Sequence, residues 1–181
     1  MRNVRKMTRL TMLLALGVIF HYVEGMIELP SIPGVRFGFA NIIGLIALYM
    51  FGPKEMFQIN LGRVVFGSLL SGRFLSTGFF LSLSGVTLCS IITAIAYKKS
   101  KLSIFGISVL SGVFHGIGQI ACVMVIYNTV AMIYYLPVLT LSAVPTGLFT
   151  GYVAYLVLKH IRGGVKLCLL NIQQKEYAVV K

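Results

Sequence analysis

Met56-Phe-Gln-Ile-Asn-Leu-Gly-Arg-Val-Val-Phe-Gly-Ser-Leu-Leu70 is an apolar run with one arginine, Arg63, at its centre. Placing an arginine in the middle of a bilayer costs roughly 2.5–3.5 kcal/mol on insertion scales. The side chain is therefore expected to face the interior of a helix bundle or a wet cavity. Two interpretations remain open: Arg63 contacts a ligand, or it pairs with a glutamate or with helix-end carbonyls and holds the bundle together.

The composition around this run indicates an integral membrane protein. Hydrophobic residues make up 57% of the chain and charged residues only 11%. Several apolar stretches approach the length needed to cross a hydrocarbon core about 30 Å thick. The net charge of +12 comes from short basic clusters between apolar segments, a pattern typical of topology signals and contacts with the lipid bilayer. No nucleic-acid-binding motif is present, so nucleic acid is not expected as a partner.

Six apolar segments predict an all-α, polytopic bundle of about six transmembrane helices. They are Met7–Tyr22, Phe37–Phe51, Met56–Leu70, Phe79–Tyr97, Ile104–Ile126 and Leu136–Leu158. At 1.5 Å per residue, the second and third segments cover little more than about 22 Å, so they are extended by neighbouring residues, tilted or broken. We expect one transmembrane domain over residues 1–160 and a short cytoplasmic tail over residues 161–181.

Lysine and arginine placement predicts the orientation. Basic residues precede the first segment, lie between the second and third and between the fourth and fifth, and follow the sixth. These positions hold 13 of the 16 lysines and arginines, whereas Arg36 and Arg73 lie on the other side and Arg63 lies within. The positive-inside rule then places both termini in the cytoplasm.

The scarcity of acidic residues argues against catalysis. The sequence has no aspartate and four glutamates, Glu24, Glu28, Glu55 and Glu176. Magnesium-dependent phosphoryl or prenyl-diphosphate chemistry usually needs clustered carboxylates. The P-loop, the Rossmann glycine fingerprint, the nucleophile elbow and the His-Glu zinc motif are all absent. We therefore expect neither an enzyme nor a bound metal or cofactor.

Polar residues suited to binding occur near the first outer connection. Glu24, Glu28 and Arg36 lie in or beside residues 25–38, whose prolines and glycines disfavour a continuous helix. This connection either caps a cavity or is an ordinary amphipathic surface loop. Asn41 follows at the start of the second helix, where its amide helps to bind a polar group or caps the helix. Asn60, in the same run as Arg63, is also a candidate binding residue.

The fifth segment contributes a second polar group. His115 and Gln119 are four residues apart and share one helical face, which favours cavity lining, although an interhelical hydrogen bond would also satisfy the histidine. Gly112 and Gly116 on this helix allow close helix approach. Residues 147–151, Gly-Leu-Phe-Thr-Gly, form another small-residue face that predicts packing.

These residues also carry a family resemblance. The strings are Arg36–Asn41, Leu45–Glu55, Leu69–Gly72, Leu81–Gly85, His115–Gln119 and Tyr135–Pro137. Over about residues 8–160 they resemble the "Gx transporter" family, which is also labelled heptaprenyl diphosphate synthase component I. That family is similar in size and topology to the substrate-binding S components of energy-coupling-factor (ECF) vitamin transporters. The resemblance implies a multi-pass protein of a prokaryotic cell membrane that binds a small molecule near the outer face.

The resemblance also implies partners, namely a membrane coupling subunit with two ATPases. Many S components show an Ala-x-x-x-Ala face on their first helix, whereas this chain keeps only the small pair Thr11 and Ala15. The alternative function is a non-catalytic membrane subunit associated with heptaprenyl diphosphate or menaquinone side-chain synthesis. A purely structural membrane protein is a third reading. The excess of outer and intramembrane arginine over glutamate favours a ligand with an anionic group.

Overall fold

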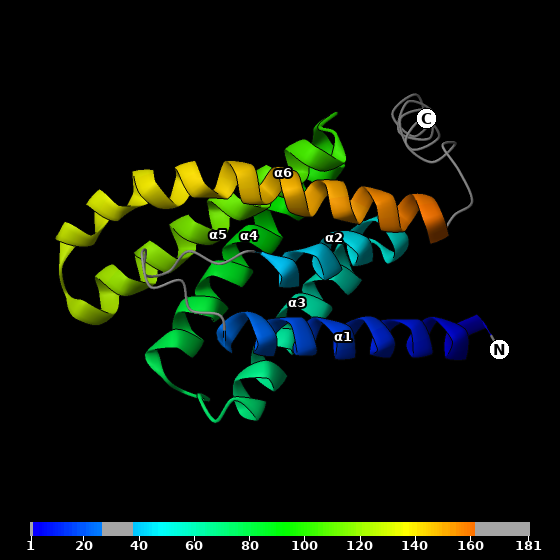
Figure 1. The fold of residues 1–181 in the computed structure, drawn as a ribbon, viewed down its shortest axis with the longest axis horizontal. Coiled ribbons are helices and arrows are strands. Elements are labelled where there is room, and N and C mark those ends of the chain that lie inside the picture. Colours follow the sequence, from blue (N-terminus) through cyan, green and yellow to red (C-terminus); the bar gives the residue numbers. More distant parts are fainter. Residues whose placement is uncertain (1, 27–37, 162–181) are drawn as a thin grey trace.

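Helices make up most of the described part of the chain, which comprises residues 2–26 and 38–161 of a computed structural model (Figure 1). They are α1 (Arg2–Met26), α2 (Phe39–Phe51), α3 (Pro53–Leu70), α4 (Thr77–Lys99), α5 (Ile104–Tyr127), the 3₁₀ helix η1 (Val130–Tyr135) and α6 (Leu136–Ile161). No strand occurs within these two ranges, and each α-helix overlaps one predicted segment. The all-α membrane fold class is therefore confirmed.

Four stretches are long and apolar enough to cross a membrane: Val4–Met26, Thr77–Lys99, Ile104–Tyr127 and Val130–Ile161. The 13-residue α2 is too short by this measure. The helix α3 carries Lys54, Glu55 and Arg63, which lower its hydropathy. The expected six crossings and their orientation thus remain predictions. Ile161, expected in the tail, belongs to α6, and residues 162–181 lie outside the described residues.

The short helix α2 lies at the centre of the bundle, between α1 and α6 in Figure 1. Residues 42–48 are all buried, and α2 contacts α1, α3, α5 and α6. A helix that is apolar on every side belongs in the core, because each face must meet another apolar surface. At Gly52, with φ of 110°, the chain turns from α2 into α3, and Pro53 starts α3 at a position where its missing N–H is not needed.

Contacts between helix ends show which ends of the helices lie together. The Lys6–Glu55 ion pair joins the start of α1 to the start of α3. The rings of Tyr49 and Tyr97, 5.4 Å apart, join the ends of α2 and α4. Phe105, at the start of α5, packs on Tyr155 near the end of α6, with ring centroids 6.1 Å apart.

These three contacts lie at one end of the bundle, which we call the basic end. Its described basic residues include Arg5, Lys6, Arg9, Lys54, Lys98, Lys99, Lys101 and Lys159. We call the opposite end the far end. The start of α1 and the end of α6 lie on the same side in Figure 1.

Glycines bring α4, α5 and α6 into close contact. A Cβ atom built on Gly118 of α5 would lie 2.8 Å from the Cα atom of Gly85 and 2.9 Å from the Ser84 carbonyl oxygen, both in α4. A Cβ atom on Gly147 of α6 would lie 2.7 Å from the Cα atom of Val109 in α5. The α5–α6 face that includes Gly147 therefore packs as the small-residue pattern predicts.

Candidate functional site

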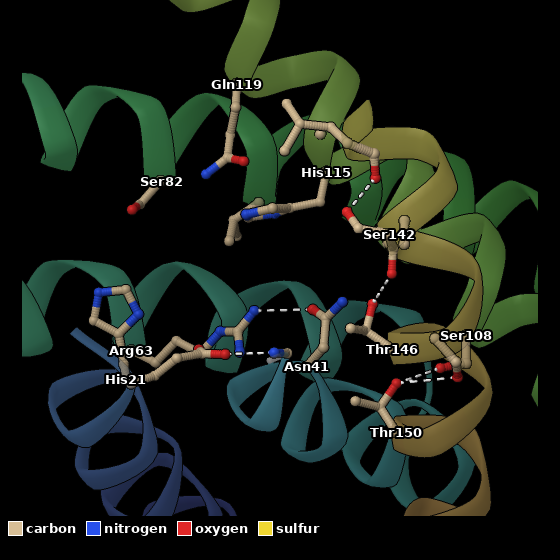
Figure 2. A pocket seen from close by; sticks show the side chains of 18 residues that line it. His21, Asn41, Arg63, Ser82, Ser108, His115, Gln119, Ser142, Thr146 and Thr150 are labelled. Carbon is tan, nitrogen blue, oxygen red and sulfur yellow. Dashed lines mark hydrogen bonds between the residues drawn. The ribbon is translucent and has the colours of Figure 1, made fainter. Parts of the chain in front are cut away.

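A polar cavity of about 80 Å³ lies in the far half of the bundle, and all six α-helices contribute to its wall (Figure 2). Eleven of its eighteen lining residues have polar side chains: His21, Glu24, Asn41, Arg63, Ser82, Ser108, His115, Gln119, Ser142, Thr146 and Thr150. So many polar groups facing one space inside an apolar bundle are suited to a polar molecule or to water. The volume is well below the ~300–1,000 Å³ typical of sites for drug-sized ligands.

Arg63 reaches the cavity from α3 and is only 2% exposed. Its stem passes Gly17 of α1, where a Cβ atom would lie 3.6 Å from the Arg63 Cβ atom. Arg63 Nη2 donates a hydrogen bond of 3.1 Å to Asn41 Oδ1 in α2, and Asn41 Nδ2 donates one of 3.4 Å to Ser111 Oγ in α5. The guanidinium group is therefore held by Asn41 of α2, which in turn is linked to α5.

The wall across from Arg63 carries His115, Gln119 and Ser82 (Figure 2). His115 and Gln119 lie one turn apart on the inner face of α5, and Gln119 is 7% exposed. His115 sits against Gly85 of α4, where a Cβ atom would lie 2.9 Å from the imidazole Cε1 atom. The glycine therefore leaves the space that the imidazole occupies.

Hydroxyl groups of α6 form a third wall. Ser142 donates to the Leu139 carbonyl at 2.9 Å, and Thr146 donates to the Ser142 carbonyl at 2.8 Å. Thr150 is 2.8 Å from Ser108 of α5. A hydroxyl group that donates to its own helix keeps its oxygen as an acceptor, so this wall can accept hydrogen bonds.

The end of α1 and the start of α2 close the remaining side. Glu24, 5% exposed, accepts a hydrogen bond from the backbone N–H of Gly38, the residue that precedes α2. A carboxylate at this position complements the positive end of the α2 dipole. His21 sits against Gly67 of α3, where a Cβ atom would lie 2.5 Å from the imidazole Cδ2 atom.

Five of the eight predicted binding residues thus line one cavity: Glu24, Asn41, Arg63, His115 and Gln119. Asn60 does not line it, because its Nδ2 atom donates to Ser90 Oγ at 2.9 Å between α3 and α4. Glu28 and Arg36 lie outside the described residues. The serines, the threonines and His21 were not among the binding residues predicted from the sequence. Ser142, Thr146 and Thr150, spaced by four, are a polar stripe that indicates one helical face.

Ionisable groups in the cavity offer little for metal binding. Within residues 2–26 and 38–161, no three His, Cys, Asp or Glu side chains are grouped to hold a metal ion. Glu24 is the single carboxylate among the lining residues. The cavity wall supplies hydrogen-bond donors and acceptors together with one guanidinium group. These groups are suited to binding a polar molecule.

Comparison with known protein families shows to which family the chain belongs. The family model of heptaprenyl diphosphate synthase component I matches residues 13–157, a range that includes every cavity-lining residue. The chain belongs to this family. No curated protein and no solved structure gives a significant match. Family membership and the apolar helices together identify a membrane component, and the family name implies a partner subunit.

Proposed function

We propose that this heptaprenyl diphosphate synthase component I family member is a substrate-binding membrane subunit. It takes a small polar molecule into the far-end cavity and relies on other subunits for energy, in the manner of an ECF S component. The observation that carries the proposal is the cavity itself: six helices of a membrane bundle enclose eleven polar side chains, including a buried arginine. A purely structural bundle does not need a buried arginine, imidazole and amide around one space, since such groups are costly to remove from water unless they have partners.

Mass spectrometry of the protein purified from its native membrane tests this proposal. We expect a small polar compound to be released when the wild-type protein is denatured. The Gln119→Leu variant, which removes an amide from the cavity, should release much less of it. The Tyr134→Phe variant is the matched control, because Tyr134 is exposed in η1 and does not line the cavity. Equal release from all three proteins, or release from none, would contradict the proposal.

The same preparation identifies the partners. A co-purifying membrane coupling subunit with ATPases supports the ECF-like function. The family name favours a second candidate, a non-catalytic subunit beside a prenyl diphosphate synthase. For either function, we expect the isolated chain to hydrolyse no ATP and to make no heptaprenyl diphosphate from farnesyl and isopentenyl diphosphates with Mg²⁺. The physical reason is that one cavity carboxylate cannot replace the clustered carboxylates that hold Mg²⁺.

A further inference from the structure

We infer that the molecule bound in the cavity carries an anionic group, held between Arg63 on one wall and His115 and Gln119 on the other. This inference rests on the proposed function, because it names the class of ligand for the same cavity. The two charged residues among the lining groups come from different helices: Arg63 donates a hydrogen bond to Asn41, and Glu24 accepts one from Gly38.

Arg63 has the position of an anion-binding side chain. Its hydrogen bond to the amide oxygen Oδ1 of Asn41 orients the guanidinium group at the wall of the cavity. A guanidinium group has five N–H donors and no acceptor, and its planar fork matches a carboxylate or a phosphate. In Figure 2 the Arg63 side chain lies on the opposite side of the cavity from His115 and Gln119.

The opposite wall of the cavity carries further hydrogen-bond donors for an anionic group. The imidazole of His115 and the amide of Gln119 each carry an N–H group, and Ser82 adds a hydroxyl. A group that lies between the two walls therefore meets donors from both sides. Carboxylate and phosphate oxygens accept several such bonds at once, and bonds to a charged partner are the stronger ones.

The carboxylate of Glu24 lines the same cavity. It accepts the Gly38 N–H at the start of α2, so part of its charge is balanced by the positive end of that helix. The limited volume, about 80 Å³, admits a small anion or one anionic group of a larger molecule. A soluble carboxylate, a phosphate ester and the head group of an anionic lipid share this chemistry.

Thermal unfolding in a neutral detergent tests the inference with named probes. Sodium acetate and inorganic phosphate represent the anionic group, acetamide is the neutral match of acetate, and sodium chloride controls for ionic strength. We expect acetate or phosphate to raise Tm in a saturable manner above the chloride control, and acetamide to have no such effect. A short-chain phosphatidylglycerol, compared with the matching phosphatidylcholine, shows whether a lipid head group is the source.

Variants assign the effect to the cavity. Arg63→Met should abolish the stabilisation by anions, and Arg63→Lys, which keeps the charge but loses the fork, should weaken it. His115→Phe and Gln119→Leu keep Arg63, and each should lower anion affinity roughly 10- to 150-fold, the scale of one charged hydrogen bond. They also keep the test available if Arg63→Met does not fold. Arg73→Met is the control, because Arg73 is exposed and outside the cavity.

The outcomes separate this inference from the proposed function. Equal stabilisation by acetamide and acetate, or full stabilisation of Arg63→Met or of the His115→Phe and Gln119→Leu pair, would overturn the inference. If a neutral or cationic compound is then released from the purified wild-type protein, the proposed function stands and the anionic ligand class is wrong. Absence of a released compound together with no response to any probe would contradict both.

Discussion

At the scale of single residues, the sequence predicted those cavity-lining residues whose burial is expensive. A charge, an imidazole or an amide inside an apolar helix is costly unless it has partners, so Arg63, His115 and Gln119 stand out. Ser142 and Thr146 were missed because a hydroxyl group satisfies itself on its own helix and carries little such cost.

The cost of burying a polar group also explains why Asn60 was selected although it does not line the cavity. Its amide is buried, as expected of a selected polar residue, but it meets Ser90 rather than the cavity. A pattern of buried polar residues therefore marks places where partners exist. It does not distinguish a partner on a neighbouring helix from a ligand, because both satisfy the same hydrogen-bonding group.

Gly118 provides a test of packing at the level of one atom. Gly118→Ala should destabilise the protein by about 1–3 kcal/mol, because the added Cβ atom would meet the α4 backbone at 2.8 and 2.9 Å and backbone cannot move aside cheaply. Gly116→Ala on the same helix should be tolerated, since its Cβ atom would lie 3.5 Å from the Leu139 Cβ atom, an ordinary contact. Thermal unfolding of both variants in detergent compares them, and equal Tm values would contradict the close α4–α5 contact.

At the scale of helices, long apolar runs predicted the elements well because a helix in lipid must satisfy its own backbone. The ends were less predictable. The helix α1 begins at Arg2 rather than Met7, since basic residues that favour water can still adopt helical geometry. The sequence also left the second segment unresolved between an extended, a tilted and a broken helix. In the structure α2 is a short helix at the centre of the bundle, and neighbouring helices bury it on all sides. This burial depends on the other helices, so the second segment alone does not reveal it.

The ion pair between α1 and α3 predicts a pH dependence at the basic end. Glu55 lies in the first turn of α3, outside the four candidate spans, and the hydrogen bond from Lys6 holds its pKa below the ordinary value of 4.5. The folded state thus favours the deprotonated carboxylate more than the unfolded chain does. The stabilisation is fully present above pH 4.5 and is lost as the pH falls through the lowered pKa of the folded state.

Glu55→Gln measures this contribution. The Tm difference between wild type and variant should be small, because exposed ion pairs contribute little, and it should shrink as the pH falls from about 6 to about 3. High salt should also reduce it through screening. Lys101→Gln, another change of a basic-end charge, is the control. A difference that stays constant across this pH range would mean that the Lys6–Glu55 pair does not form.

At the scale of the whole molecule, the alternation of helices gives the two ends different chemistry. The basic end carries the described lysines and arginines named above, whereas the described far end carries Arg73. The cavity lies in the far half, with Glu24 and His21 near the end of α1 and Ser142 near the start of α6. If the basic end faces the cytoplasm, as the positive-inside rule predicts, the cavity lies in the outer half of the membrane.

Cysteine labelling in intact cells tests this orientation. In a background with Cys89, Cys122 and Cys168 replaced, Lys99→Cys probes the basic end and Tyr134→Cys probes the far end, where Tyr134 is 82% exposed. A membrane-impermeant maleimide should modify the Tyr134→Cys variant in intact cells and the Lys99→Cys variant only after permeabilisation.

Leu148→Cys serves as the control for lipid exposure. Leu148 is 49% exposed on α6, within a candidate span, so its replacement thiol should meet lipid and react poorly in either condition, because the reactive thiolate needs water. Modification of the Lys99→Cys variant in intact cells, with protection of the Tyr134→Cys variant, would invert the orientation. The cavity would then lie in the cytoplasmic half, where a molecule made inside the cell has access, and that result would favour the biosynthetic subunit over the uptake component.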